Sequence, residues 1–424
     1  MTINIRPRSR PMACLMLAAT LVMAAPRAAV AQDTVPQPSA GVPGILPEPH
    51  FIIRAIDFAT RTMGDGSGEK SGLYPEMANM ITGAGWISAG PGFRQWFGGD
   101  RAILDMSAAM SWRSYKMARG RFEFTNLAKS RLALGSEVKW QDYTQNTYFG
   151  SGPDSLESNR SEYRVKSLNA VGYSNLRPVK WLTIGARGGW LRSPDLLEPS
   201  GKFNRGNPAA QLMFPGEAAF ARADQPAYLH GELSVTADTR DRRSHPLNGG
   251  LYRASWSRFS DRDGGNFSFR RVDAEAAQFA TIDAARLTVA AHGWLVASDT
   301  DTGHDIPFYL MPSLGGNNTL RAFANYRFHD RNLAVANVEL RLALLDHFDA
   351  ALFADAGNVA ARVGDLNFDR RSFGVGVRMH SAKATFARLD VAHGSEGWRL
   401  TFNTADPLHL SRLSRRTAPI PFVP

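Results

Sequence analysis

Cysteine is almost absent from this sequence. The 424 residues contain one, Cys14, and this scarcity excludes a disulfide scaffold, a cysteine-based zinc module and an iron–sulfur protein. Charged residues are also sparse at 21%, whereas hydrophobic residues make up 44% and aromatic residues 10% of the chain. A disordered chain carries more charge and fewer aromatic side chains. The composition therefore predicts a folded protein.

Long apolar runs are missing too, apart from Met12–Ala25 near the start of the chain. Arginines at positions 6, 8 and 10 precede this run and the small residues Ala29–Ala31 follow it, which is the pattern of a cleaved signal peptide. A membrane anchor is disfavoured because the run is shorter than the roughly 20 residues that a spanning helix needs. We therefore predict that residues 1–31 are a signal peptide and that the protein is exported.

The positive net charge of the chain is smaller once the predicted signal peptide is left out. The chain has a net charge of +10, and residues 1–31 contribute four arginines and no acidic residue, which leaves 45 basic against 39 acidic side chains and a net charge of +6. These charges are scattered along the chain. A nucleic acid partner is therefore not expected.

The chain has three further predicted parts. Residues 32–75 form a Pro- and Gly-rich linker that includes a short amphipathic helix over His50–Met63, whose apolar residues share one helical face. Residues 76–404 form the main folded part. Residues 405–424 form a C-terminal tail whose prolines and arginines disfavour a strand.

In the main part, apolar and polar residues alternate with a period of two. In Tyr228–Asp238, the apolar or small residues at odd positions alternate with polar residues at even positions. The same alternation recurs in Leu132–Gln141, Asn332–Leu342 and Trp398–Asn403. Such alternation predicts β-strands with one apolar and one polar face.

A soluble sandwich and a membrane barrel both produce this pattern. The expected strands run to about 10 residues, which suits a tilted strand crossing a bilayer and exceeds the roughly 5 or 6 residues typical of soluble sheets. Polar faces carry charges of both signs, as at Glu339 and Arg341 or Arg388 and Asp390, which suits a wet lumen. We therefore predict an all-β fold, a transmembrane antiparallel β-barrel of about 16 strands with a short N-terminal helix.

Four motifs occur in order along the predicted barrel. They are Tyr148–Ser155; Asp238–Asp241 followed by Pro246–Asn248 and Gly250–Tyr252; Leu314–Gly316 followed by Leu320–Phe323; and the Phe-x-Asp-x-Gly pattern of Phe353, Asp355 and Gly357. Together they resemble the bacterial surface antigen barrel of the outer-membrane protein assembly factor and two-partner secretion transporter superfamily. The resemblance covers about residues 77–402.

This resemblance implies a 16-stranded outer-membrane barrel whose sixth external loop folds back into the lumen. There the loop arginine, Arg321, pairs with the strand carboxylate, Asp355. A guanidinium group matches a carboxylate bidentately, so a pair shielded from water would hold the loop in place. The alternative is that both residues are ordinary lumen charges.

Two departures from the family affect the expected function. Ala322 stands where family members usually carry glycine. Because alanine resists positive φ, the loop of this chain could adopt a different position from that of the family. Residues 32–75 also leave too little room for the polypeptide-transport-associated domains that receive clients, so a barrel-only member is expected. Client delivery would then need a periplasmic partner or would not occur.

The last strand resembles the terminal targeting signal of outer-membrane barrels, carried here by Gly397, Leu400 and Phe402. The expected partners are outer-membrane lipids, the barrel assembly machinery during biogenesis, and unfolded or lipid clients. The expected location is the outer membrane of a Gram-negative bacterium.

Signals for catalysis are weak. The sequence has no nucleophile elbow, zinc-protease helix or phosphate-binding loop. Asp299, Asp301 and Asp305 fit a solvated loop better than a calcium loop, and the lumen histidines His230 and His292 with Ser234 or Thr288 are weak evidence for a lipid hydrolase. We expect no catalytic, cofactor or metal site. The leading function is insertion or translocation of protein or lipid; a passive channel or structural barrel is the main alternative, and a lipid-modifying enzyme the weaker one.

Overall fold

The computed structural model describes residues 43–50, 53–54, 71–77, 88–200, 206–221, 224–242, 245–264, 266–282, 284, 286–381 and 385–403. The predicted signal peptide and C-terminal tail lie outside these residues. His50, Ile53 and Arg54 of the predicted N-terminal helix are helical; the other positions of that helix also lie outside, so its extent stays a prediction. No helix among the described residues is long and apolar enough to cross a membrane.

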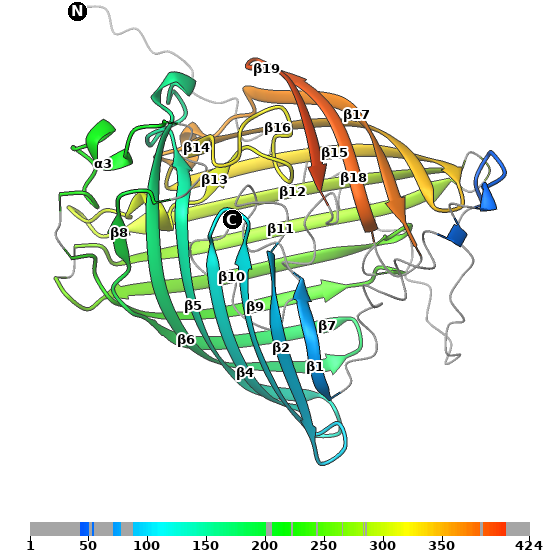
Figure 1. Cartoon of the computed structure of the whole chain (residues 1–424), viewed down its shortest axis with the longest axis horizontal. Coiled ribbons are helices and arrows are strands. Elements are labelled where there is room, and N and C mark those ends of the chain that lie inside the picture. Colours follow the sequence, from blue (N-terminus) through cyan, green and yellow to red (C-terminus); the bar gives the residue numbers. More distant parts are fainter. Residues whose placement is uncertain are drawn as a thin grey trace, which may run out of the picture. The chain divides into compact units, whose positions relative to one another are not determined.

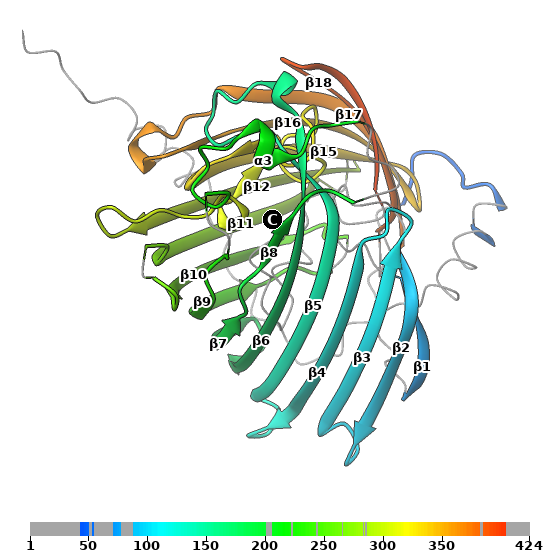
Figure 2. The same ribbon diagram turned by 60° about the vertical axis from the view of Figure 1, so that its left-hand side comes forward.

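In the part of the chain that the structure describes, sixteen strands form one antiparallel sheet in which each of the sixteen pairs with the next of them (Figures 1 and 2). They are β1 (Gly72–Met77), β2 (Ser88–Phe97), β3 (Ala102–Ser111), β4 (Lys116–Leu127), β5 (Leu132–Tyr148), β6 (Ser161–Val179), β7 (Leu182–Leu191), β9 (Tyr228–Asp238), β10 (Gly249–Asp261), β11 (Phe269–Ile282), β12 (Leu287–Thr300), β15 (Asn332–Leu345), β16 (Phe348–Ala360), β17 (Arg370–His380), β18 (Thr385–Gly394) and β19 (Gly397–Asn403). This up-and-down order of 16 strands confirms the predicted fold class.

Shorter elements occupy the connections. β8 (Asp195–Leu197) pairs with β6, and β13 (Ser313–Leu314) pairs with β14 (Phe328–His329). Short helical turns are η1 (Glu157–Asn159), α3 (Ala210–Met213), η3 (Phe308–Leu310) and η4 (Val363–Asp365). In Figure 1, α3, β8, β13 and β14 lie at the same end of the strands.

The outward face of the sheet is apolar and its inward face is polar, the reverse of the arrangement in a soluble protein. In β17, Phe373 and Val375 are 58% and 52% exposed, whereas Arg378 on the opposite face is fully buried. The same holds in β16, where Leu352 is exposed and Phe353 and Asp355 are buried. Apolar side chains that point outward and charged ones that point inward are what a barrel in hydrocarbon requires.

The two ends of the barrel differ in the length of their connections. Residues 192–227 and 301–331 join strands at one end, and turns as short as residues 180–181 and 346–347 join them at the other. Outer-membrane barrels have long external loops and short periplasmic turns. We therefore call the first the external end and the second the short-turn end.

Some strand boundaries differ from those expected. β5 and β6 have 17 and 19 residues, more than a strand needs to cross the bilayer. The β5–β6 hairpin is therefore long enough to extend past the external surface of the bilayer. The first strand begins at Gly72, four residues before the start predicted for the barrel, because residues 72–77 pair with β2. At the short-turn end, the amides of Ile45 and Leu46 donate to carbonyls of Ala343 and Leu344, which ties residues 43–48 to the end of β15.

Candidate functional site: the inward loop and its charge network

The loop at residues 301–331, here called the inward loop, connects β12 to β15 and folds against the inner face of the barrel. Its β13–β14 pair joins Ser313 to His329 and Leu314 to Phe328. Gly315 and Gly316 follow β13 with φ of 111° and 97°, and a Cβ on Gly315 would come within 2.4 Å of the Ala324 carbonyl oxygen. Both positions therefore require glycine, which explains the Leu-Gly-Gly motif.

Arg321 lies at the tip of this turn and contacts two carboxylates. Its Nη2 is 2.7 Å from Asp355 Oδ1 on β16, and its Nη1 is 2.7 Å from Glu339 Oε2 on β15. Its backbone amide also donates to Asp355 Oδ2, and its guanidinium carbon lies 3.5 Å from the centre of the Phe353 ring. Arg321 therefore uses its planar fork, its charge and its π-face at once.

Neutral donors complete the shell of Asp355. Asn337 Nδ2 donates to Oδ1 at 2.9 Å and Ser372 Oγ donates to Oδ2 at 2.7 Å. Asn337 also donates to the Thr319 carbonyl in the loop. Three strands thus converge on one carboxylate and on the loop backbone beside it.

The charges extend from Arg321 across four neighbouring strands. Glu339 accepts from Arg341 and Arg378, and Arg378 Nη1 donates to Asp390 at 2.6 Å. Arg388 lies 3.4 Å from Asp390 and donates back to the loop at the Asn317 carbonyl. The charge network, as we call it, comprises Arg321, Glu339, Arg341, Asp355, Arg378, Arg388 and Asp390.

Burial makes this network different from scattered lumen charges. The side chains of Glu339, Asp355, Arg378 and Asp390 are 0% exposed, and that of Arg321 is 2% exposed. Ions out of contact with water are stable only when paired with good geometry. The network therefore fixes the positions of the side chains that meet the inward loop.

Ala322 and Phe323 lie beside Arg321 in an apolar cluster with Phe328, Phe353 and other inward residues. Ala322 is buried and does not have positive φ; among the described non-glycine residues of the inward loop, only Tyr326 does. Alanine at this position therefore causes no backbone strain. The loop does not have to change its position to accommodate alanine in place of glycine. Its methyl group instead packs towards Gly394 of β18, where an added Cβ would lie 2.9 Å away.

A second clamp on the loop was not anticipated from the sequence. Arg327 donates to Glu396 at 2.7 Å, in the connection between β18 and β19, and to the hydroxyl and carbonyl oxygens of Ser155. Gly152 in the same external segment donates to the His329 carbonyl. The Tyr148–Ser155 motif was noted in the sequence, and its role here is to dock on the inward loop.

The other predicted positions are placed as follows. Gly357 on β16 packs against the backbone of β15, where an added Cβ would meet the Ala334 carbonyl oxygen at 2.5 Å. Gly397 is the first residue of β19 and has φ of 97°, and Leu400 and Phe402 are 68% and 40% exposed on the outward face. This face suits a targeting signal, which stays a prediction.

The weaker candidates for other chemistry have ordinary partners. His230 contacts Asn169, and His292 contacts Glu275 and Asn337. Asp301 and Asp305 pair with Arg270 and Arg331. The structure thus gives each of these four side chains a partner within the protein.

The fold and this site together define an outer-membrane type of β-barrel with a loop anchored inside its lumen. Residues 99–395, most of the chain, match the Omp85 superfamily domain. The chain therefore belongs to the Omp85 superfamily, whose outer-membrane barrels take part in protein insertion and translocation.

One solved structure supports the fold, and two more distant ones are also similar. The chain is similar to BamA from Haemophilus ducreyi lacking POTRA domains 1-3, at 14% identity over 82% of this chain and 77% of that one, with a TM-score of 0.58. CdiB from Acinetobacter baumannii is 13% identical over 78% and 58% of the two chains with a TM-score of 0.45, and CdiB from Escherichia coli is 10% identical over 82% and 69% with a TM-score of 0.48. No curated protein sequence matches.

Proposed function

We propose that this protein acts in the insertion or translocation of protein or lipid at the outer membrane and that the inward loop, held by Arg321, is its working part. The observation that supports this proposal is the geometry of Arg321. One loop side chain contacts Asp355 and Glu339 on two adjacent strands, inside a buried network that reaches two more strands. A loop attached in this way can transmit a change in strand positions to the lumen.

Burial of the network favours this function over a passive channel. A pore needs a water-filled path, yet the inward side chains of Glu339, Arg378 and Asp390 are out of contact with water. At the external end, Tyr148, Phe308 and their neighbours form a further buried cluster. Packing of the loop against the barrel wall at these two levels would narrow the lumen and reduce ion conduction.

The two ends of the sheet are the natural place for a client to meet the barrel. Among the described residues, β1 and β19 are the shortest of the sixteen strands, with 6 and 7 residues, and they form the two ends of the pairing order. An unpaired strand edge can accept an added strand from another chain. We infer that client segments enter at this seam, delivered by a periplasmic partner, and that the protein is not an enzyme.

The experiment that tests the proposed function is depletion of the protein followed by an inventory of outer-membrane proteins and lipids. Specific proteins or lipids should be lost and should return on complementation with the native chain. Complementation with Arg321→Ala should fail, whereas Arg187→Ala, which removes a lumen ion pair with Glu232 far from the loop along the sheet, should succeed. An unchanged inventory after depletion would contradict the proposal.

Conductance distinguishes the passive channel. Reconstituted native protein should give small, fluctuating currents, and deletion of residues 305–329 should enlarge them because the loop and its contacts leave the lumen. A deletion within the external residues 361–369, between β16 and β17, serves as the control. Large, steady currents from the native protein would support the channel instead.

A further inference from the structure

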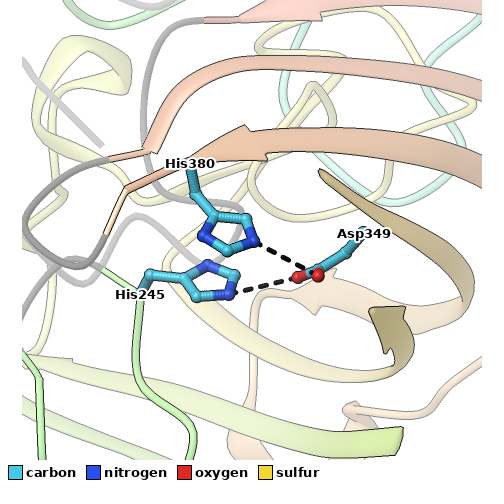
Figure 3. A group of neighbouring side chains, drawn as sticks. All are labelled: His245, Asp349 and His380. Carbon is cyan, nitrogen blue, oxygen red and sulfur yellow. Dashed lines mark hydrogen bonds and ion pairs between the residues drawn. The ribbon is translucent and has the colours of Figure 1, made fainter. Parts of the chain in front are cut away.

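Two histidines and one aspartate meet inside the barrel at its short-turn end, away from the inward loop. His245 belongs to the connection between β9 and β10, Asp349 is the second residue of β16, and His380 is the last residue of β17. Figure 3 shows the two imidazole rings face to face, with the Asp349 carboxylate at the same edge of both. Their potential ligand atoms all lie within 4.8 Å of one another.

The contacts aim one nitrogen of each ring at a different oxygen of the same carboxylate. His245 Nε2 is 3.1 Å from Asp349 Oδ2, and His380 Nε2 is 3.2 Å from Asp349 Oδ1. The ring centres are 3.6 Å apart and the ring planes differ by 7°. Both nitrogens and the carboxylate therefore border one small volume.

Burial sets this group apart from surface histidines. His245, Asp349 and His380 are 2%, 4% and 7% exposed. Two imidazoles stacked in a buried place gain little from apolar packing, and the Nδ1 of His380 is buried without a hydrogen-bond partner among the described residues. Hydrogen bonding to Asp349 thus accounts for only part of the arrangement.

Described residues on both sides of His245 in the β9–β10 connection are joined by hydrogen bonds. Asp241 Oδ1 accepts from the amides of Leu247 and Asn248, and Gly249, with φ of 89°, approaches the Thr239 carbonyl too closely for a Cβ. Three strands, β11, β12 and β15, separate β10 from β16 along the sheet. His245 therefore reaches β16 and β17 from a connection whose own strands lie elsewhere in the sheet.

We propose that His245, Asp349 and His380 bind a divalent transition-metal ion, zinc in the first instance. Two imidazole nitrogens and one carboxylate oxygen are donors that zinc prefers, whereas magnesium and calcium prefer oxygen alone. Zinc binds such ligands at about 2.0–2.2 Å in tetrahedral geometry, so this set would fill three positions and leave a fourth for water. This proposal departs from the sequence analysis, which predicted no metal site.

The ion would replace two N–H donors and link three elements. It would fasten the β9–β10 turn to β16 and β17 at the end of the barrel where residues 43–48 also attach. Strand positions at this end would then depend on metal occupancy.

The proposal is tested with the purified full chain in detergent after treatment with a chelator. Titration calorimetry with zinc sulfate should show one bound ion, and the same titration with magnesium sulfate should show none. X-ray absorption at the zinc edge should show two imidazole nitrogens and one carboxylate oxygen. Native protein that binds no zinc, or a spectrum without imidazole ligands, would overturn the proposal.

Matched variants separate this site from other histidines. His245→Gln and His380→Gln each keep an N–H donor for Asp349, so the barrel should still form, but each should weaken zinc binding at least tenfold. His347→Gln is the control, because His347 lies at the same end and contacts Glu48 instead. Unchanged zinc affinity in both test variants would show that the group is only a hydrogen-bonded clamp; if a variant does not form the barrel, the spectrum of the native protein decides.

Discussion

Arg321 is the residue at which loop and barrel are coupled. Its charge is permanent and its five N–H donors lie in one plane, so it can bind two carboxylates on neighbouring strands without rearrangement. Asp355 and Glu339 are adjusted to it by other residues: Asn337 and Ser372 orient the first, and Arg341 and Arg378 orient the second. Lysine would supply the charge at this position but not the fork.

Removal of either partner should loosen the loop. Arg321→Ala leaves Asp355 with neutral donors only, and Asp355→Ala leaves Arg321 with Glu339 alone, so each should cost about 3–5 kcal/mol in loop docking. Protease access near Gly315 measures this cost. The double variant should be no worse than the worse single variant, since the residues act as a unit. Additive effects in the double variant would show that the two side chains act independently.

The contact between Ala322 and Gly394 can be tested by exchanging alanine and glycine between the two positions. Gly394→Ala places a methyl group 2.9 Å from Ala322 Cβ and 3.0 Å from the Arg371 carbonyl oxygen, so it should destabilise loop docking by about 1–3 kcal/mol. Ala322→Gly in the same chain should recover part of the loss, because it removes the closest of the contacts. Thermal unfolding and proteolysis report the effect. Full docking in Gly394→Ala alone would contradict the packing described here.

At the scale of elements, the inward loop is held from two sides. The charge network on β15 to β18 holds the tip of the loop at Arg321. Arg327 and His329 hold its return limb, residues 325–330, against the external segment 148–155. His329 lies in β14 with its ring near those of Tyr148 and Tyr326. The second attachment therefore contains a titratable side chain.

Acid should release the return limb of the loop. Burial lowers the pKa of His329 to about 3, below its ordinary value of 6.5. The docked state therefore favours the neutral ring, and its stability is fully present above about pH 6.5 and is lost as the pH falls towards 3. Protease access near residues 325–330, measured from pH 7 to pH 4, should rise in the native chain and rise less in His329→Asn. Equal profiles in the two proteins would assign the pH dependence to other groups.

At the scale of the whole molecule, the outward apolar band and the inward charges make the barrel stable only with hydrocarbon around it. Every one of the sixteen strands is paired along the chain, so opening must begin at the seam between its ends or by separation of long hairpins such as β5–β6. A barrel built in this way unfolds cooperatively and slowly.

The protein should therefore be heat-modifiable on gels. Unboiled samples should migrate faster than boiled ones, because the barrel persists in detergent until it is heated. Membrane fractionation should place the chain in the outer membrane, and N-terminal sequencing should find Gln32 first if the proposed signal peptide is removed. Intact protein in the soluble periplasmic fraction, or no mobility shift on boiling, would argue against a membrane barrel.

Local patterns in the sequence determined the strands and the fold class. Alternation of period two is a property of neighbouring residues, so Tyr228–Asp238 was located to its last residue as β9. The motif spacing also brought Phe353, Asp355 and Gly357 to one face of β16. The pairing of Arg321 with Asp355 came from the family resemblance, and its functional role stays a prediction.

Only the tertiary structure decided which distant residues meet inside the lumen. Arg327 and Ser155 are 172 positions apart, and nothing in either local sequence indicates the other. His245, Asp349 and His380 belong to segments that are distant in the sequence, and only the curvature of the sheet brings them together. The physical reason is that a strand's pattern fixes which face each side chain occupies, whereas the curvature and stagger of the whole sheet fix what lies opposite it across the lumen.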